Sequence, residues 1–76
     1  GGVDAAGRKV TEEASEVLIA AKDDATAETS GANRTATRAA LAGETADLLF
    51  HALVLIAERD VSPSAVIDVL RGRHSG

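Results

Sequence analysis

One segment, residues 35–59, constrains the fold of this chain more than any other. On a helical wheel its apolar side chains cover most of the circumference and leave one polar strip, made of Glu44, Asp47, His51 and Glu58. A helix that is apolar nearly all round is a buried helix. A chain of 76 residues has too little other material to cover it, because so short a chain buries only about 60% of its unfolded surface. The segment therefore predicts a central helix shared with a second copy, most simply in a homodimer.

Two other segments have helical signals. In residues 4–22, small and apolar side chains recur at intervals of three, four and seven, and Asp4 is the expected cap. Ser62-Pro63 supplies an N-cap and a first-turn proline for a third helix, which we expect to end near Gly72. No segment alternates as a strand does, so the chain is expected to be all-α, as a single domain over residues 1–76.

The segment between the first two helices has a different composition. Residues 23–34 hold no large apolar side chain and contain the breaker sequence Ser30-Gly31-Ala32-Asn33. This composition predicts a long mobile loop, at the upper end of ordinary loop lengths. Asn33 or Thr35 is the expected N-cap of the helix that follows. The predicted order is therefore a long helix, a long loop, a long buried helix and a short C-terminal helix.

Charge and composition exclude several functional classes. Twelve acidic against eight basic residues give a net charge of −4, which argues against a nucleic-acid partner. The chain has no cysteine, hence no disulfide and no thiolate metal site, and this fits a cytoplasmic protein. The longest apolar run, residues 48–57 with His51 included, is shorter than the roughly 20 residues of a membrane span. We therefore expect no membrane partner.

Two short acidic motifs lie on the first two predicted helices. Glu12, Glu13 and Glu16 have the spacing E-E-x-x-E, and Glu44 and Asp47 have the spacing E-x-x-D. Residues three apart share a helix face, so an antiparallel pair of helices can bring four carboxylates to one point. Partly buried carboxylates repel one another unless cations neutralise them.

Two interpretations of these acids stay open at this point. Glutamate is common on solvated helix faces, and E-E-x-x-E alone fits that reading. The E-x-x-D motif, however, occupies the polar strip of an otherwise apolar helix, where an acid without a role is unfavourable. Clustered oxygen ligands favour Mg²⁺ or Mn²⁺, and a diphosphate substrate supplies the remaining ligands of such an ion.

Three stretches also resemble a known family. They are residues 8–22 (RKVTEEASEVLIAAK), 43–57 (GETADLLFHALVLIA) and 61–74 (VSPSAVIDVLRGRH). Together they are similar to phosphoribosyl-ATP pyrophosphatases of histidine biosynthesis, within the all-α MazG-type nucleotide pyrophosphohydrolases. The resemblance covers nearly the whole chain outside residues 23–34. The family's further N-terminal helix is not matched, and the 23–34 segment is longer than usual in the family.

The resemblance implies an activity and a set of site residues. It implies an all-α homodimer that hydrolyses phosphoribosyl-ATP to phosphoribosyl-AMP and pyrophosphate with Mg²⁺, and Mn²⁺ as a substitute. The implied metal ligands are Glu13, Glu16, Glu44 and Asp47. Glu12 matches the first glutamate of the motif, and either Glu12 or Glu13 is the candidate for accepting a proton from the attacking water.

Three further residues are candidates for substrate binding. Lys9 precedes the acidic motif and shares a helix face with Glu13. His51 lies one turn after Asp47, either as a hydrogen-bonded residue at the edge of the core or as a ligand contact. Arg73 matches the family's terminal basic motif, although arginine near a helix C-terminus is favourable in any case.

Two alternative functions remain open from sequence. One keeps the chemistry and changes the substrate, as in a MazG-type hydrolase of nucleoside or deoxynucleoside triphosphates. The other is a non-catalytic helical dimerisation module whose acids are solvated.

Overall fold

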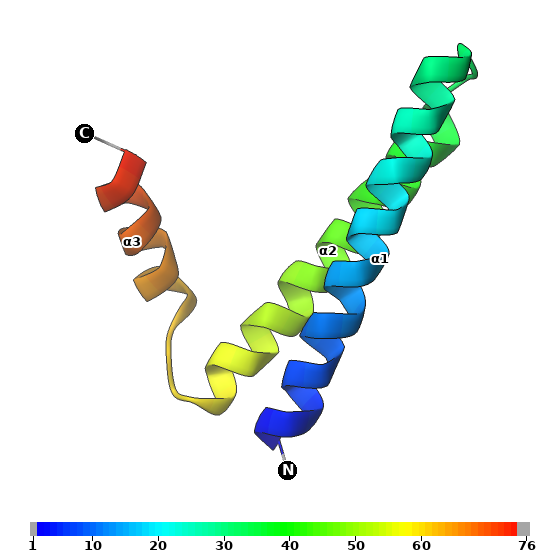
Figure 1. Cartoon of the computed structure of the whole chain (residues 1–76). Helices are drawn as coiled ribbons and strands as arrows, with labels where there is room; N and C mark the ends of the chain where they lie inside the picture. Colours follow the sequence, from blue (N-terminus) through cyan, green and yellow to red (C-terminus); the bar gives the residue numbers. More distant parts are fainter. Residues whose placement is uncertain (1, 75–76) are drawn as a thin grey trace.

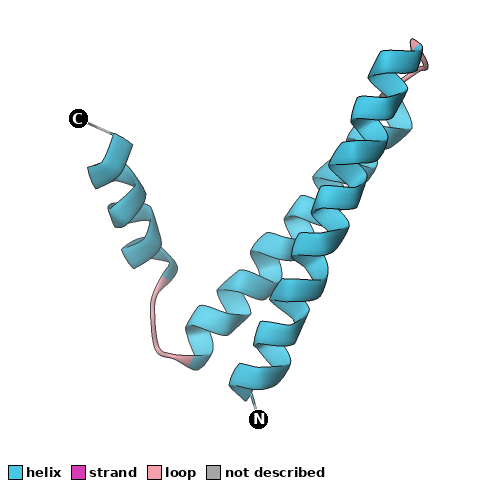
Figure 2. Ribbon diagram, in the orientation of Figure 1, coloured by secondary structure: helices cyan, strands magenta, loops and turns pink. Residues whose placement is uncertain are grey.

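The computed structural model describes residues 2–74 and forms three helices without strands in that range. They are α1 (Gly2–Ser30), α2 (Thr35–Glu58) and α3 (Pro63–His74). α1 and α2 lie side by side as an antiparallel hairpin, and α3 stands away from them, so that the chain has the outline of a V (Figures 1 and 2). The all-α, three-helix prediction is confirmed.

The predicted loop over residues 23–34 is wrong for most of its length. α1 begins at Gly2 and continues to Ser30, so the connection to α2 is only residues 31–34. α1 ends where Gly31 takes a left-handed conformation with φ of 75°. The Gly31 N–H then donates to the Glu28 carbonyl at 3.1 Å and the Ala32 N–H to the Ala27 carbonyl at 2.9 Å, which closes the last turn. The polar segment is therefore a helix whose stop signal is Gly31.

The other helix ends are close to those predicted. Arg34 holds the N-cap position of α2, and Asn33 assists it because its Oδ1 accepts from the Thr35 N–H at 2.8 Å. α2 ends at Glu58 with Arg59 as its C-cap. Asp60 follows with φ of 57°, and the Val61 N–H donates to the Ile56 carbonyl at 2.9 Å.

α3 begins as the sequence predicts and runs slightly further. The Ser62 Oγ accepts from the Ala65 N–H at 3.3 Å, and Pro63 is the first helical residue. The helix continues to His74, two residues beyond the predicted end at Gly72.

The contact between α1 and α2 follows a heptad pattern. The seam is formed by residues that alternate at spacings of three and four and are buried or half-buried: Ala6, Val10, Glu13, Val17, Ala20, Asp24 and Ala27 on α1, and Arg34, Thr37, Leu41, Glu44, Leu48, His51 and Leu55 on α2. This spacing is that of an antiparallel coiled coil. Two acids of α1, Glu13 and Asp24, thus lie inside the seam and not on the solvated side.

The chain is flat and leaves its apolar surface open. Its extents are 45 × 38 × 14 Å, and its radius of gyration is 15.4 Å, compared with about 11 Å for a compact domain of this length. No residue of α2 is buried in the single chain. The prediction that α2 is a buried central helix therefore requires a further molecule and stays a prediction.

α2 also has the length and mean hydropathy of a membrane span, a test that core helices of soluble proteins pass as well. The longest apolar run alone did not predict this, because alanines outside that run also keep the average over the longer window high. Glu44 and Asp47 lie in the middle of the helix, where charges are expensive inside a bilayer. We therefore retain the expectation that α2 packs against protein.

Candidate metal and active site

Three carboxylates from two helices converge in the middle of the hairpin. One oxygen each of Glu13, Glu44 and Asp47 lies within 4.8 Å of the others. Glu13 and Glu44 are seam residues, and Asp47 lies one turn beyond Glu44 at the exposed edge. The antiparallel packing of α1 and α2 thus brings together three of the four predicted metal ligands.

Glu16, the fourth predicted ligand, adjoins these three. Burial, followed by the neighbouring carboxylates of Glu16, Asp47 and Glu44, raises the pKa of the Glu13 carboxyl above its ordinary value. Burial and the neighbouring Glu16 and Asp47 likewise raise the pKa of Glu44. Both shifts report an accumulation of negative charge that no basic side chain of the described residues compensates.

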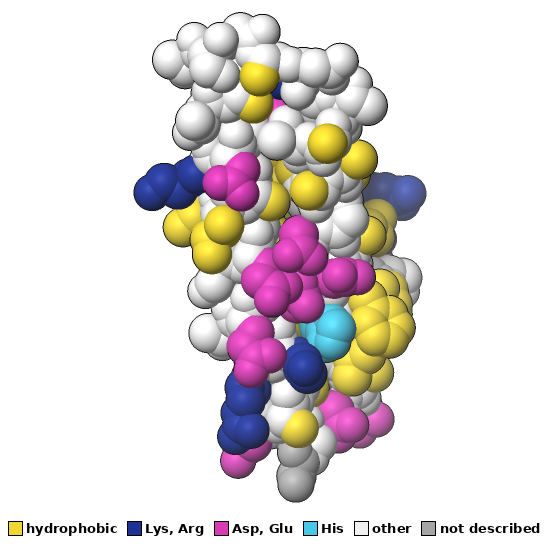
Figure 3. All heavy atoms as spheres, turned by 90° about the vertical axis from the view of Figure 1, so that its right-hand side faces the viewer, with side chains coloured by type: hydrophobic (Ala, Val, Ile, Leu, Met, Phe, Trp, Pro, Cys, Tyr) yellow, Lys and Arg dark blue, Asp and Glu magenta, His cyan; other side chains and the backbone are white. Residues whose placement is uncertain are grey.

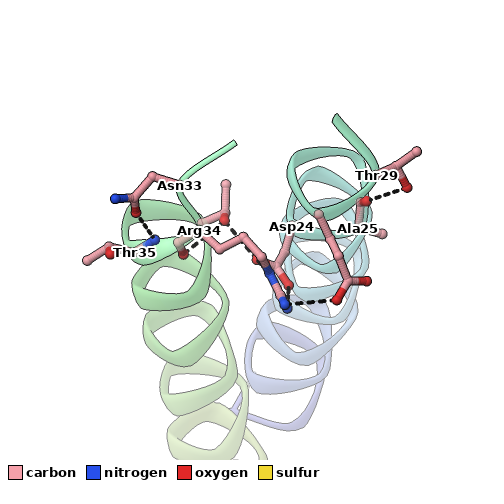
Figure 4. Close-up of polar contacts among 8 residues, drawn as sticks. Asp24, Ala25, Thr29, Asn33, Arg34 and Thr35 are labelled. Atoms are coloured by element: carbon pink, nitrogen blue, oxygen red, sulfur yellow. Dashed lines mark hydrogen bonds and ion pairs between the residues drawn. The ribbon is translucent and has the colours of Figure 1, made fainter. Parts of the chain in front are cut away.

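A second acidic position in the seam shows how the fold compensates a carboxylate. Asp24 accepts hydrogen bonds from Arg34 Nε at 3.1 Å, Arg34 Nη2 at 2.6 Å and Thr37 Oγ1 at 2.7 Å (Figure 4). Arg34 Nη1 also donates to Glu28 at 2.9 Å. The hydrogen bonds from Arg34 and then Thr37 lower the pKa of Asp24 to about 2. Sequence reasoning missed these partners because it treated residues 23–34 as a loop; the heptad spacing from Ala6 to Ala27 is the signal that reveals them.

The contrast between the two acidic layers favours a cation at the first. Asp24 is fully paired, whereas Glu13 Oε2 is buried and has no hydrogen-bond partner. A buried, unpaired carboxylate oxygen is unfavourable unless a cation or proton meets it. The available donor atoms are carboxylate oxygens, the type that Mg²⁺ and Mn²⁺ prefer. The residues therefore fit such an ion.

A groove of about 680 Å³ extends from these carboxylates toward the turn. Glu16, Glu44 and Asp47 line one end, and the lining beyond them is mainly small or apolar, including Ala20, Ala36, Ala40, Gly43 and Ile19. Acidic side chains gather at the centre of this side of the hairpin, with a histidine and apolar side chains beside them (Figure 3). The arrangement offers a charged end for a metal–phosphate group and a mainly small and apolar floor for the rest of a ligand, in which Asp23 and Thr37 are the polar residues.

The two residues that precede the cluster on α1 lie outside it. Lys9 Nζ and Glu12 Oε2 form an ion pair of 3.7 Å, and both side chains are more than half exposed. Lys9 thus meets Glu12 and not Glu13 or Glu16. The structure holds Glu12 beside the carboxylate cluster with its charge already partly balanced.

The remaining two candidates for substrate binding, His51 and Arg73, differ in their surroundings. His51 lies in the seam, where its Nδ1–H donates to the Asp47 carbonyl at 2.8 Å and its ring contacts Phe50 edge to face. This leaves Nε2 available for another partner. Arg73 lies on α3 and is exposed. The ion pairs found among residues 2–74 do not include it.

The model of one protein family, phosphoribosyl-ATP pyrophosphohydrolase, matches residues 3–74. The chain belongs to this family. The family match agrees with the resemblance of the acidic motifs and of the C-terminal helix, and it covers the 23–34 segment as well.

Curated relatives of the family support the assignment. The chain is 51% identical over 74 residues to the histidine biosynthesis bifunctional protein HisIE of Deinococcus radiodurans, covering 97% of this chain and 28% of the relative. It is 46% identical to the HisIE protein of Bacillus subtilis, covering 97% and 30%. It is 43% identical over 73 residues to the phosphoribosyl-ATP pyrophosphatase of Burkholderia cenocepacia, covering 96% and 54%. The chain thus spans about a third to a half of the length of these relatives. No solved structure matched it.

Proposed function

We propose that this chain hydrolyses phosphoribosyl-ATP to phosphoribosyl-AMP and pyrophosphate, the second step of histidine biosynthesis, in the cytoplasm. The names of its relatives support this activity and pathway. The observation that carries the proposal is the meeting of Glu13, Glu44 and Asp47 within 4.8 Å beside a groove. A solvated helix face does not require acids from two helices to converge inside a packed seam.

In this proposal Glu13, Glu16, Glu44 and Asp47 hold Mg²⁺, for which Mn²⁺ substitutes. A bound ion supplies neutralisation of the phosphate charge and a lower pKa for a coordinated water. The four side chains come from two helices that the Asp24–Arg34 ion pair joins near the turn. The protein therefore contributes preorganised acids, and no covalent nucleophile is needed.

The residues around the acids supply proton transfer and substrate contacts. Glu12 or Glu13 accepts the proton of the attacking water. Glu13 lies in the seam, and Glu12 lies beside it at the surface. Lys9, which pairs with Glu12, and His51, whose Nδ1 is bonded to the Asp47 carbonyl, contact phosphate or sugar oxygens in this proposal. Arg73 reaches substrate only if α3 packs near a carboxylate cluster, which the single chain does not achieve.

We also propose that the active species is a homodimer. Leu49 and Phe50 are each 61% exposed on α2, and Leu53 is 45% exposed. Apolar residues grouped in this way on a helix without a covering layer mark an interaction surface. A second copy packed against this surface would give α2 the burial that its composition predicts.

The decisive experiment measures pyrophosphate release from phosphoribosyl-ATP with and without Mg²⁺, for the parent chain and for Asp47→Asn. Because the substitution removes charge without changing shape, we expect it to abolish Mg²⁺-dependent release while the helix content stays unchanged. Asp68→Asn on α3 is the matched control and should retain full activity. Equal turnover by Asp47→Asn and its parent would disprove the assignment. Faster hydrolysis of deoxynucleoside triphosphates than of phosphoribosyl-ATP would make those triphosphates the assigned substrate. No pyrophosphate release from either compound would favour a non-catalytic dimer.

A further inference from the structure

Helix α3 has no packing surface within its own chain. All residues of Pro63–His74 are exposed, and α3 makes no substantial contact with α1 or α2 (Figure 1). Its apolar residues Val66, Ile67, Val69 and Leu70 are 41–50% exposed. A helix of 12 residues is marginally stable in water by itself. A partner is therefore required to hold α3.

The surface area of the chain indicates how large that partner contact is. The accessible area is 5588 Å², whereas a compact chain of this mass exposes about 4,300 Å². The excess is about 1,250 Å² per chain, or about 2,500 Å² for two copies, which is in the range of obligate dimer interfaces. A second copy of this V therefore accounts for the open surface without any other partner.

We propose that α3 of one copy docks on α2 of a second copy, and that the exchange is reciprocal about a two-fold axis. This inference rests on the homodimer of the proposed function and specifies how it is built. The apolar arc of α3 covers the exposed arc of α2 formed by Leu49, Phe50, Leu53 and Val54. Reciprocal exchange follows because a two-fold interface uses the same patches twice.

Charge supports the same pairing. Residues 2–58 carry ten acidic and five basic side chains, whereas α3 carries Asp68 and two arginines, Arg71 and Arg73. On a helical wheel Arg73 lies on the apolar side of α3, and Asp68 lies opposite with Ser64. The side of α3 that meets a second copy is thus basic, and the hairpin that receives it is acidic, which favours docking between copies.

Cysteine cross-linking tests the exchange, because the chain has no cysteine of its own. A full-length chain with Leu53→Cys and one tag is mixed with a chain carrying Leu70→Cys and a different tag, allowed to exchange subunits, and treated with a flexible bismaleimide. We expect a product joining the two tags, at least tenfold more abundant than with the control pair Leu53→Cys and Ser64→Cys, whose second cysteine faces away. Circular dichroism verifies that each variant is helical.

The other outcomes separate the exchange from the proposed function. A Leu53→Cys/Leu70→Cys double variant that cross-links within single chains at high dilution would show that α3 folds back on its own hairpin, and would overturn the exchange. Dimers by sedimentation that give no two-tag product would also overturn it. If these dimers still release pyrophosphate from phosphoribosyl-ATP, the proposed function stands and only the exchange fails. Monomers alone would overturn both the dimer and the exchange.

Discussion

The substitution Leu53→Glu tests the dimer most directly. The exposed fractions of Leu49, Phe50, Leu53 and Val54 amount together to about two whole side chains, whose burial is worth about 3–6 kcal/mol per copy. Leu53 alone, 45% exposed, contributes about 0.7–1.4 kcal/mol per copy. A glutamate at this position would also bury a carboxylate in the interface, which costs several kcal/mol per ion. Symmetry applies the change twice, so we expect association to weaken by at least about 4 kcal/mol, or about 1,000-fold in Kd.

Sedimentation velocity over a concentration series measures this loss, and circular dichroism follows the helix content of the same samples. The parent chain should sediment as a dimer at micromolar concentration and the Leu53→Glu variant as a monomer. Leu53→Met is the matched control, because it conserves volume and apolarity and should leave the dimer intact. A Leu53→Glu variant with a Kd within tenfold of the parent value would refute the assignment of this face of α2 to the interface.

Three further predictions concern the hairpin itself. In metal-free protein, Glu44→Gln should raise the Tm because it removes like-charge repulsion. Mg²⁺ at a hundredfold excess over its Kd should stabilise only the parent, by about 2.7 kcal/mol. If neither the substitution nor Mg²⁺ changes the Tm, the acids are solvated. The pKa of Asp24, about 2 because Arg34 and Thr37 donate to it, gives stability that is present above the ordinary value near 4 and is lost as pH falls toward 2. Acid titration by circular dichroism should therefore show a step that Asp24→Asn lacks, and identical titration curves would exclude the pair as a stabilising contact. Gly43→Ala meets no atom within 4 Å, so it should stabilise α2 by about 1 kcal/mol and raise the Tm by about 4–8 °C; an unchanged or lower Tm would contradict the open space at this position.

Sequence was sufficient for the elements that depend on local signals. The strip of Glu44, Asp47 and His51 on an apolar helix marked the side of α2 that lies along α1, and Ser62-Pro63 predicted the start of α3. These patterns succeed because capping and periodicity act within one or two turns. The convergence of acids from two helices was also predictable, since residues three apart share a face.

The loop predicted for residues 23–34 was wrong because a tertiary contact stabilises helix there. Asp23 and Asp24 are unfavourable near a helix C-terminus, and the missing large side chains suggested a loop. Arg34 and Thr37, across the turn, reverse that balance for Asp24. A contact between residues ten positions apart is not visible in the propensity of either segment. The same limit applies to α3, whose packing surface lies outside the single chain.

The position of the Asp24–Arg34 pair also has a consequence for the order of folding. The pair joins the ends of a loop short enough to close in about 10–100 ns, and it lies next to the turn, whereas the mutually repelling acids Glu13 and Glu44 lie further along the seam. We expect the two helices to pair first at the turn and then progressively away from it. The Asp24–Arg34 pair would then form and set the register before Glu13 and Glu44 come together. The carboxylates would then meet last, on helices already aligned, and a divalent cation would act mainly by slowing unfolding.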